Sequence, residues 1–238
     1  MARAGKTQRG RQTRARIVAA AARLFGEHGY LDTTMAAIAA DAGVAVQTLY
    51  LAFGSKVAIL EAAHDVTVVG DDEPVALLER SWVADLRADP DGPRALELAI
   101  ANTLRVIERV SPIYGVIQSA AADPEVAELL ARTKTQRLAT LRTLAEMLAA
   151  KAGFAAGLSA DRAADILYAV VSDELYRVLV VERQWSAEDW KTWAYESAAV
   201  RLFPQSTPSK DAKRPPPKRP TATKQDATAI GRARSPRK

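Results

Sequence analysis

Side chains suited to covalent or metal chemistry are scarce in this sequence. There is no cysteine, and the two histidines, His28 and His64, both fall within predicted helices. Their spacing matches no metal site, and we find neither a glycine-rich phosphate loop nor a Gly-x-Ser-x-Gly elbow. We therefore predict that the protein is not an enzyme and that it has no metal site and no cofactor.

Side chains suited to reading DNA bases stand together near the N-terminus, in residues 44–53. Val44 and Leu49 are spaced to face inward, which leaves small and polar side chains on the outer face of a short helix. Gln47 could pair with adenine through two hydrogen bonds, and small apolar side chains could pack on thymine methyl groups. The candidates for base contact are Ala45, Val46, Gln47 and Thr48.

Phosphate contacts are predicted from three further side chains. Tyr50 lies on the same outer face, and Arg14 stands at the start of the first predicted helix. Lys56 follows Ser55, a predicted N-cap, at a helix N-terminus that itself favours phosphate.

The charges are unevenly distributed along the chain. Residues 1–16 carry six basic and no acidic side chains, and residues 204–238 carry ten basic and two acidic ones. Of 33 basic and 28 acidic residues, 17 and 26 therefore remain in residues 17–203, a net charge of −9. Basic arms on an acidic body favour a localised phosphate-binding surface, although the C-terminal arm could simply increase solubility.

Four helices are predicted before residue 71, placed by their apolar spacing and by cap residues. Gly29 is expected to end the first as a left-handed cap, and Thr33 or Thr34 to begin the second, which ends at Gly43. The predicted helices are 14–29, 34–43, 44–53 and 56–70.

The rest of the sequence up to Phe203 also predicts helices, divided by proline, glycine and N-cap residues. Because no segment shows a sustained alternation of apolar and polar residues, we predict an all-α fold. After Phe203 the composition offers too little apolar surface to fold, which predicts a disordered tail over 204–238. The expected helices are 74–88, 93–110, 112–121, 124–152, 160–183 and 187–203.

Two short helices joined through Gly43 are typical of a helix-turn-helix, and the sequence around them resembles a known family. Residues 13–60 resemble the DNA-binding domain of the tetracycline-repressor (TetR) family. The residues that carry the resemblance are Ile17, Ala21, Leu24, Phe25, Gly29, Tyr30, Thr33, Thr34, Ile38, Ala39, Ala42, Gly43, Val44, Leu49, Tyr50, Phe53, Ser55, Lys56 and Leu60.

The resemblance implies a homodimer that binds a palindromic operator, usually represses, and is released by a small molecule in its C-terminal domain. By position it implies DNA contacts from Thr33, Thr34, Ala45, Gln47, Thr48, Tyr50 and Lys56. One departure is Ala52, which stands where the family commonly has a histidine and puts a phosphate contact there in doubt.

We expect four parts: a basic arm over 1–13, the TetR-type domain over 14–62 with the helix-turn-helix at about 34–53, an effector-binding and dimerisation domain over 63–203, and the tail. Residues 63–203 resemble the family only in layout. The segments 160–183 and 187–203 carry wider apolar faces than one domain uses, and a dimer interface would cover them. The resemblance to the family also implies a dimer interface formed by these last two segments.

Polar and aromatic residues within the apolar helices are candidates for a small-molecule site, although such residues more often belong to the core. Residues 61–203 carry 15 basic and 23 acidic side chains, which favours a cationic or neutral effector over an anionic one. The candidates are Trp82, Tyr114, Gln118, Met147, Asp173 and Tyr176.

The sequence therefore predicts a DNA-binding transcriptional regulator. The alternative is an architectural protein that binds nucleic acid nonspecifically through its basic arms, and the ratio of specific to nonspecific affinity would separate the two. No apolar run approaches the roughly 18 residues of a membrane span, so we expect a cytoplasmic, nucleoid-associated protein without membrane contact.

Overall fold

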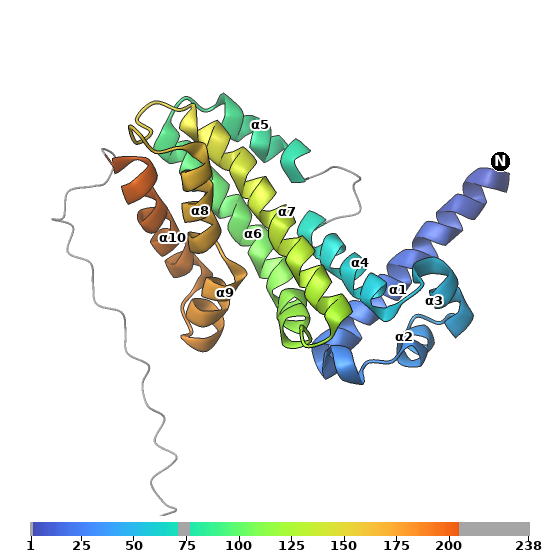
Figure 1. Cartoon of the computed structure of the whole chain (residues 1–238). Helices are drawn as coiled ribbons and strands as arrows, with labels where there is room; N and C mark the ends of the chain where they lie inside the picture. The colour runs from blue at the N-terminus through green and yellow to red at the C-terminus, as the bar shows by residue number, and fades with distance from the viewer. Residues whose placement is uncertain (1, 71–76, 205–238) are drawn as a thin grey trace, which may run out of the picture. The chain divides into compact units, whose positions relative to one another are not determined.

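The computed structural model describes residues 2–70 and 77–204. Within them the regular structure is helical, apart from an isolated bridge between Asp91 and Ala152 (Figure 1). The predicted all-α fold is confirmed. The predicted disordered tail lies, from residue 205 onward, outside the described residues.

The first four helices are α1 (Ala2–Asp32), α2 (Met35–Asp41), α3 (Val46–Phe53) and α4 (Lys56–Val69). The sequence predicted all four, but α1 begins twelve residues earlier than expected, so the segment taken as a basic arm is helical. Its alanine, arginine, lysine and glutamine residues favour helix, and no proline interrupts them.

Gly29 interrupts α1 near its end, in a way that differs from the prediction. Its φ of 77° is positive, as expected, but its ψ of 172° lies outside the left-handed helical region. Gly29 therefore kinks the chain, and helical structure continues to Asp32. The kink returns Tyr30 to the ring of Phe25, with ring centroids 5.8 Å apart.

The remaining helices follow α4 after a gap in the description at residues 71–76. The segment predicted as one helix over 74–88 contains a short 3-10 turn and then α5, divided at Arg80. The elements are η1 (Leu77–Glu79), α5 (Ser81–Ala88), α6 (Gly92–Ser119), α7 (Pro124–Ala149), α8 (Ala160–Val170), α9 (Asp173–Tyr176), η2 (Arg177–Glu182) and α10 (Ala187–Leu202).

Pro112 does not divide α6 into the two helices that the sequence predicted. The helix continues through Pro112, which is exposed. Proline has no N–H to donate to the carbonyl one turn earlier, and at an exposed position water can bind that carbonyl instead. The resulting helix is 28 residues long, so it can contact both ends of the described structure.

The segment predicted as one helix over 160–183 is broken at Val171 and Ser172. Val171 has non-helical torsions (φ −97°, ψ 59°), and Ser172 then begins a new helix by accepting a hydrogen bond from Leu175 N at 3.1 Å. The new helix, α9, continues into the π-helical segment η2. The prediction missed Ser172 as an N-cap followed by two acidic residues.

Two hydrophobic cores meet along α6. The first half of α6 packs with α5, α7, α8 and α10 through residues such as Leu96 and Ile100. Its last turns, with Ile113 and Ile117, pack with α1, α2, α3 and α4. The predicted domain boundary at residues 62 and 63 falls within α4, so one helix belongs to both predicted domains. The division of the chain into these domains stays a prediction.

In residues 2–70 and 77–204, no single helix is long and apolar enough to cross a membrane. The bent pair α2–α3 reaches the required length and apolar composition only when its two helices are counted together.

Candidate functional site

The helix-turn-helix consists of α2, a turn at Gly43, and α3. The directions of the two helices differ by 107°, within the usual range for this motif. Gly43 has a φ of 65°, which a residue with a side chain adopts at a cost, and Val44 N donates to Ala39 O at 3.0 Å across the turn. Thr34 begins α2, its hydroxyl accepting from Ala37 N at 3.0 Å, as one of the two predicted N-caps.

The helix α3 buries one side and exposes the other. Leu49 is fully buried in the core that α3 shares with its neighbouring helices, and Val44 and Thr48 are half-buried. Four of the predicted DNA contacts are exposed on the outer side, namely Ala45, Val46, Gln47 and Tyr50. None of these four side chains carries a charge, so α3 could read bases through Gln47 and through apolar contact with thymine methyl groups.

The structure corrects the role predicted for Thr33. Its side chain is 2% exposed, and its hydroxyl donates to Gly29 O at 2.7 Å and lies 3.1 Å from Leu24 O. The prediction that this side chain contacts DNA is therefore wrong. The buried hydroxyl instead fixes the end of α1 at the kink.

Lys56 also has a structural role that the sequence did not predict. Its Nζ donates to Tyr30 O at 2.7 Å and to Thr33 O at 3.0 Å, and lies 3.4 Å from Leu31 O and 4.1 Å from the Tyr30 ring. Because the ammonium is engaged within the protein, the phosphate contact predicted for it is not supported. Burial lowers the pKa of Lys56 below its usual value.

Arg14 joins the N-terminal part of α1 to the end of α3. Its Nη1 donates to Ala52 O at 3.2 Å, and its guanidinium lies 4.1 Å from the centre of the Phe53 ring. The side chain remains exposed, so its other donors are available to a phosphate. Ala52 is thus held through its carbonyl, while its methyl group is exposed.

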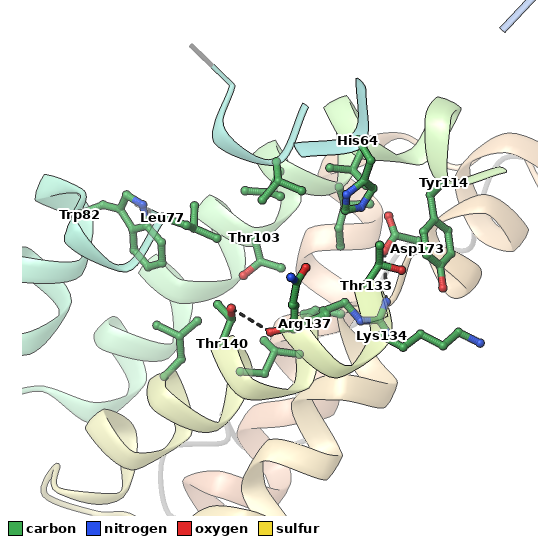
Figure 2. A pocket seen from close by; sticks show the side chains of 18 residues that line it. His64, Leu77, Trp82, Thr103, Tyr114, Thr133, Lys134, Arg137, Thr140 and Asp173 are labelled. Atoms are coloured by element: carbon green, nitrogen blue, oxygen red, sulfur yellow. Dashed lines mark hydrogen bonds and ion pairs between the residues drawn. The ribbon is translucent and has the colours of Figure 1, made fainter. Parts of the chain in front are cut away.

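A cavity lies between α4, η1, α5, α6, α7 and the α8–α9 break, with a volume of about 130 Å³. Figure 2 shows Trp82 and Leu77 at one end and His64, Thr133, Asp173 and Tyr114 gathered at the other. The cavity therefore has an apolar end and a polar end.

An ion-pair network closes the polar end. Arg137 Nη1 lies 3.1 Å from Asp173 Oδ2 and 3.4 Å from Glu174 Oε2, and the guanidinium stacks on Tyr168 at 4.0 Å. The Tyr114 hydroxyl donates to Glu174 Oε1 at 2.8 Å. The α8–α9 break thus positions two carboxylates against α6 and α7.

The pKa values in this network reflect burial and charge together. Burial raises the pKa of Asp173 above its usual value, although Arg137 acts against the rise. Burial acts in the same sense on Glu174, but its backbone hydrogen bond, Tyr114 and Arg137 together hold the pKa of Glu174 below its usual value. Burial and the bond to Glu174 raise the pKa of Tyr114, so it stays protonated.

Three buried polar atoms around the cavity have no hydrogen-bond partner among the described residues: Asp173 Oδ1, Arg137 Nε and His64 Nδ1. His64 Nδ1 lies 3.6 Å from the exposed carboxylate of Asp65, too far for a hydrogen bond. Buried polar groups are normally satisfied, and exceptions often mark a binding function.

Of the six predicted small-molecule contacts, Trp82, Tyr114 and Asp173 line the cavity. The other three do not. The Gln118 amide donates to Glu174 Oε1 at 3.4 Å. Met147 packs on the core of the C-terminal helices, and Tyr176 lies edge-on to Trp190. Sequence reasoning missed His64, Thr103, Thr133, Lys134, Gln136, Arg137 and Thr140 among the polar lining residues.

Large apolar side chains are exposed on the elements predicted to form a dimer interface. Val178 and Val181 on η2 and Val200 on α10 are each 41–49% exposed. Trp190, in contrast, is fully buried within the chain, so part of the apolar surface assigned to a dimer belongs to the core.

Comparison with known proteins agrees with the helix-turn-helix. Residues 17–63 match the family model described as "Bacterial regulatory proteins, tetR family". A search of curated proteins found no match.

Solved structures similar to this one include TetR-family regulators and two named regulators. A TetR-family regulator from Rhodococcus sp. has a TM-score of 0.63 at 18% identity, covering 80% of this chain and 98% of its own. NalD of Pseudomonas aeruginosa, described as the secondary repressor of a multidrug efflux pump, has 0.62 at 20%, covering 82% and 99%. FadR of Bacillus subtilis, solved with stearoyl-CoA, has 0.61 at 19%, covering 79% and 97%.

The structural likenesses establish a shared fold, and the family model adds the DNA-binding segment. The exposed face of α3 lies within the residues that match the family model, on a helix-turn-helix whose two helices meet at the usual angle. Residues 17–63 are therefore similar to the TetR family of bacterial regulatory proteins, and the described part of the chain shares its fold with solved TetR-family regulators.

Proposed function

We propose that this DNA-binding regulator binds a palindromic operator as a homodimer, represses transcription, and releases the DNA when a small molecule enters the cavity. The observation that carries the proposal is the exposed side of α3, where Ala45, Val46, Gln47 and Tyr50 face outward while Leu49 is buried. Such a helix is suited to the major groove.

The regulatory part of the proposal is supported by the cavity and by the described functions of similar proteins. NalD is described as a repressor, and FadR was solved with a bound ligand. In this chain His64 and Val68 of α4, the helix that follows α3, line the cavity. A ligand there would contact the helix that supports the DNA-binding surface.

The dimeric part is supported by the exposed valines of η2 and α10, Val178, Val181 and Val200. A second copy that covers them would remove apolar surface from water. We expect the two α3 helices to be spaced by one DNA turn, roughly 34–36 Å, or somewhat more.

The test begins with an operator selected by the full-length protein from random duplexes. Binding is measured by fluorescence anisotropy at fixed salt, for the wild type and for Gln47→Ala. Because a well-placed base contact contributes about 1–3 kcal/mol, we expect about tenfold weaker binding to the operator and little change on random DNA. Glu146→Ala, at an exposed position on α7 that does not line the cavity, is the matched control and should bind DNA like the wild type.

Equal affinity for selected and random duplexes would contradict the proposal and favour the architectural alternative, which the basic ends of the chain support. Deletion of residues 205–238 provides a second measurement. If the tail contributes phosphate contacts alone, its loss weakens binding to both DNAs equally and reduces the salt dependence.

A further inference from the structure

The buried carboxylate of Asp173 is the starting point. The residue is 4% exposed, and its Oδ2 receives a hydrogen bond from Arg137 Nη1 at 3.1 Å. Its Oδ1 is equally buried but has no hydrogen-bond partner in the described part of the chain. A buried acceptor left without a donor destabilises the folded protein, and more strongly when it is charged. A ligand that donates to Oδ1 would recover this free energy.

The charge balance at this end of the cavity favours a positively charged donor. Asp173 and Glu174 share one nitrogen of Arg137, so two carboxylates face one guanidinium. The charge of Lys134 also acts on Glu174, but Figure 2 shows its ammonium extending away from the cavity, so Arg137 is the cation that pairs with Asp173. A cation would complete the pairing, whereas an anion would be repelled by Glu174 and Asp173.

The opposite end of the cavity is apolar. Trp82 and Leu77 lie there (Figure 2), and Leu141 and Leu144 also line the cavity. Burial of a hydrocarbon or aromatic group against these side chains is favourable, because it removes apolar surface from water. The ligand therefore needs an apolar body as well as a donor.

We infer that the cavity binds an amphiphilic organic amine, with its ammonium hydrogen-bonded to Asp173 Oδ1 and its apolar body against Trp82 and Leu77. This inference rests on the proposed regulatory function for its biological meaning, but the binding itself can be tested without DNA. His64, whose Nδ1 has no hydrogen-bond partner among the described residues, lies on α4 beside the polar end and would accept a second hydrogen from the same ammonium.

An acidic ligand is the main competitor, because Arg137 Nε is also buried without a partner in the described residues. The guanidinium charge, however, is already balanced by Asp173 and Glu174, and it stacks on Tyr168. A ligand carboxylate at Nε would place a third anion beside the two. The geometry therefore favours the amine.

A matched series of ligands tests the inference on the wild-type, full-length protein. The compounds 4-phenylbutylamine, 4-phenylbutan-1-ol and 4-phenylbutyrate have the same body and differ in the head group. Affinity is measured by isothermal titration calorimetry near neutral pH. We expect the amine to bind at least about tenfold more tightly than the acid, with the alcohol between them. Equal or tighter binding of the acid, or no binding of the three compounds up to their solubility limits, would overturn the inference.

Two carboxylate variants locate the interaction. Asp173→Asn keeps the size of the side chain but removes its charge, and should reduce the preference for amine over alcohol by about tenfold. Asp161→Asn removes an exposed carboxylate that pairs with Arg142 at 2.7 Å and should leave the preference unchanged. If Asp173→Asn fails to fold, the ranking of the three compounds by the wild type still decides the matter.

The experiment separates the ligand class from the regulatory role. Operator binding by the wild type is measured with and without saturating amine. If the amine binds with the expected preference but operator affinity does not change, the ligand class stands and the proposed release from DNA fails. If the acid binds more tightly while operator binding is specific, the regulator stands and the amine is wrong.

Discussion

The polar groups around α2 and α3 differ from those around the cavity in how completely they are paired. Lys56 donates to main-chain carbonyls of Tyr30 and Thr33, Thr33 donates to Gly29 O, and Thr34 and Ser55 cap the helices that they begin. The DNA-binding region thus fixes its own helix ends with its own side chains. Its outward surface is formed before DNA is present.

The polar groups of the cavity region are incompletely paired. His64, Arg137 and Asp173 each have a buried polar atom without a partner among the described residues, and all three line one space. A surface that must fit one DNA shape benefits from rigidity, whereas a site that must respond to a ligand can retain unpaired groups until the ligand arrives. Variants in the two regions should therefore differ in effect.

The largest effect is expected from Arg137→Met. It leaves the buried carboxylate of Asp173 without its cation, and loss of one partner of a buried pair typically costs about 3–5 kcal/mol. Arg142→Met, five residues along α7, breaks an exposed pair with Asp161 and should cost less than about 1 kcal/mol. Urea unfolding followed by circular dichroism gives both free energies.

A second substitution sharpens this test. In Arg137→Met, the further change Asp173→Asn removes the stranded charge and should restore part of the lost stability. Equal stability of the Arg137→Met and Arg142→Met variants would contradict the idea that the network is buried and interdependent.

A smaller effect is expected from Lys56→Met. The variant loses hydrogen bonds to two carbonyls at the α1–α2 junction, for about 1–3 kcal/mol, and should also weaken operator binding because α2 and α4 lose a shared anchor. Lys151→Met is its match in the other region, since Lys151 Nζ donates to Arg87 O at 2.7 Å and Asp89 O at 2.6 Å.

The two lysine variants should lose similar stability and differ in DNA affinity, measured by anisotropy on the selected operator. A loss of affinity in Lys151→Met as large as in Lys56→Met would show that global stability, rather than the local anchor, controls DNA binding.

The same contrast explains what the sequence could predict. In the DNA-binding region the helix signals are local, since Thr34, Gly43 and Ser55 each act on residues within a few positions. The second helix, the turn and the recognition helix were therefore predicted with their faces. The role of Lys56 was missed because its acceptors lie 23–26 residues earlier in the chain.

In the cavity region the determining contacts are distant in sequence. Arg137 meets Asp173 and Glu174 36 and 37 residues later, and Tyr114 meets Glu174 across 60. No spacing rule predicts such pairs. Asp173 and Tyr114 were nonetheless among the candidates, because polar side chains within apolar helices are rare enough to notice. His64 was considered only as a candidate metal ligand, and not as part of a small-molecule site.

The smallest effect, restricted to alkaline pH, comes from two tyrosines that again lie in the two regions. Burial, with added repulsion from Asp123 and Glu125, raises the pKa of Tyr30 from 10.0 to about 12 in the folded protein. The contribution of the Tyr30 proton to the free energy of unfolding is therefore complete below about pH 10. This contribution falls as the pH rises from about 10 to 12, because the unfolded chain loses the proton first.

Tyr30→Phe should reduce that alkaline fall while changing the free energy of unfolding little at pH 7, because the Tyr30 hydroxyl makes no hydrogen bond within the described part of the chain and its ring contacts with Phe25 are retained. Tyr114→Phe should also reduce the fall, since the pKa of Tyr114 is raised, but it should cost about 1 kcal/mol at pH 7 through loss of the bond to Glu174. Urea unfolding at several pH values separates the two. An unchanged alkaline slope in Tyr30→Phe would mean that its hydroxyl is solvated in the folded state, and that the α1 kink is less tightly closed than the cavity.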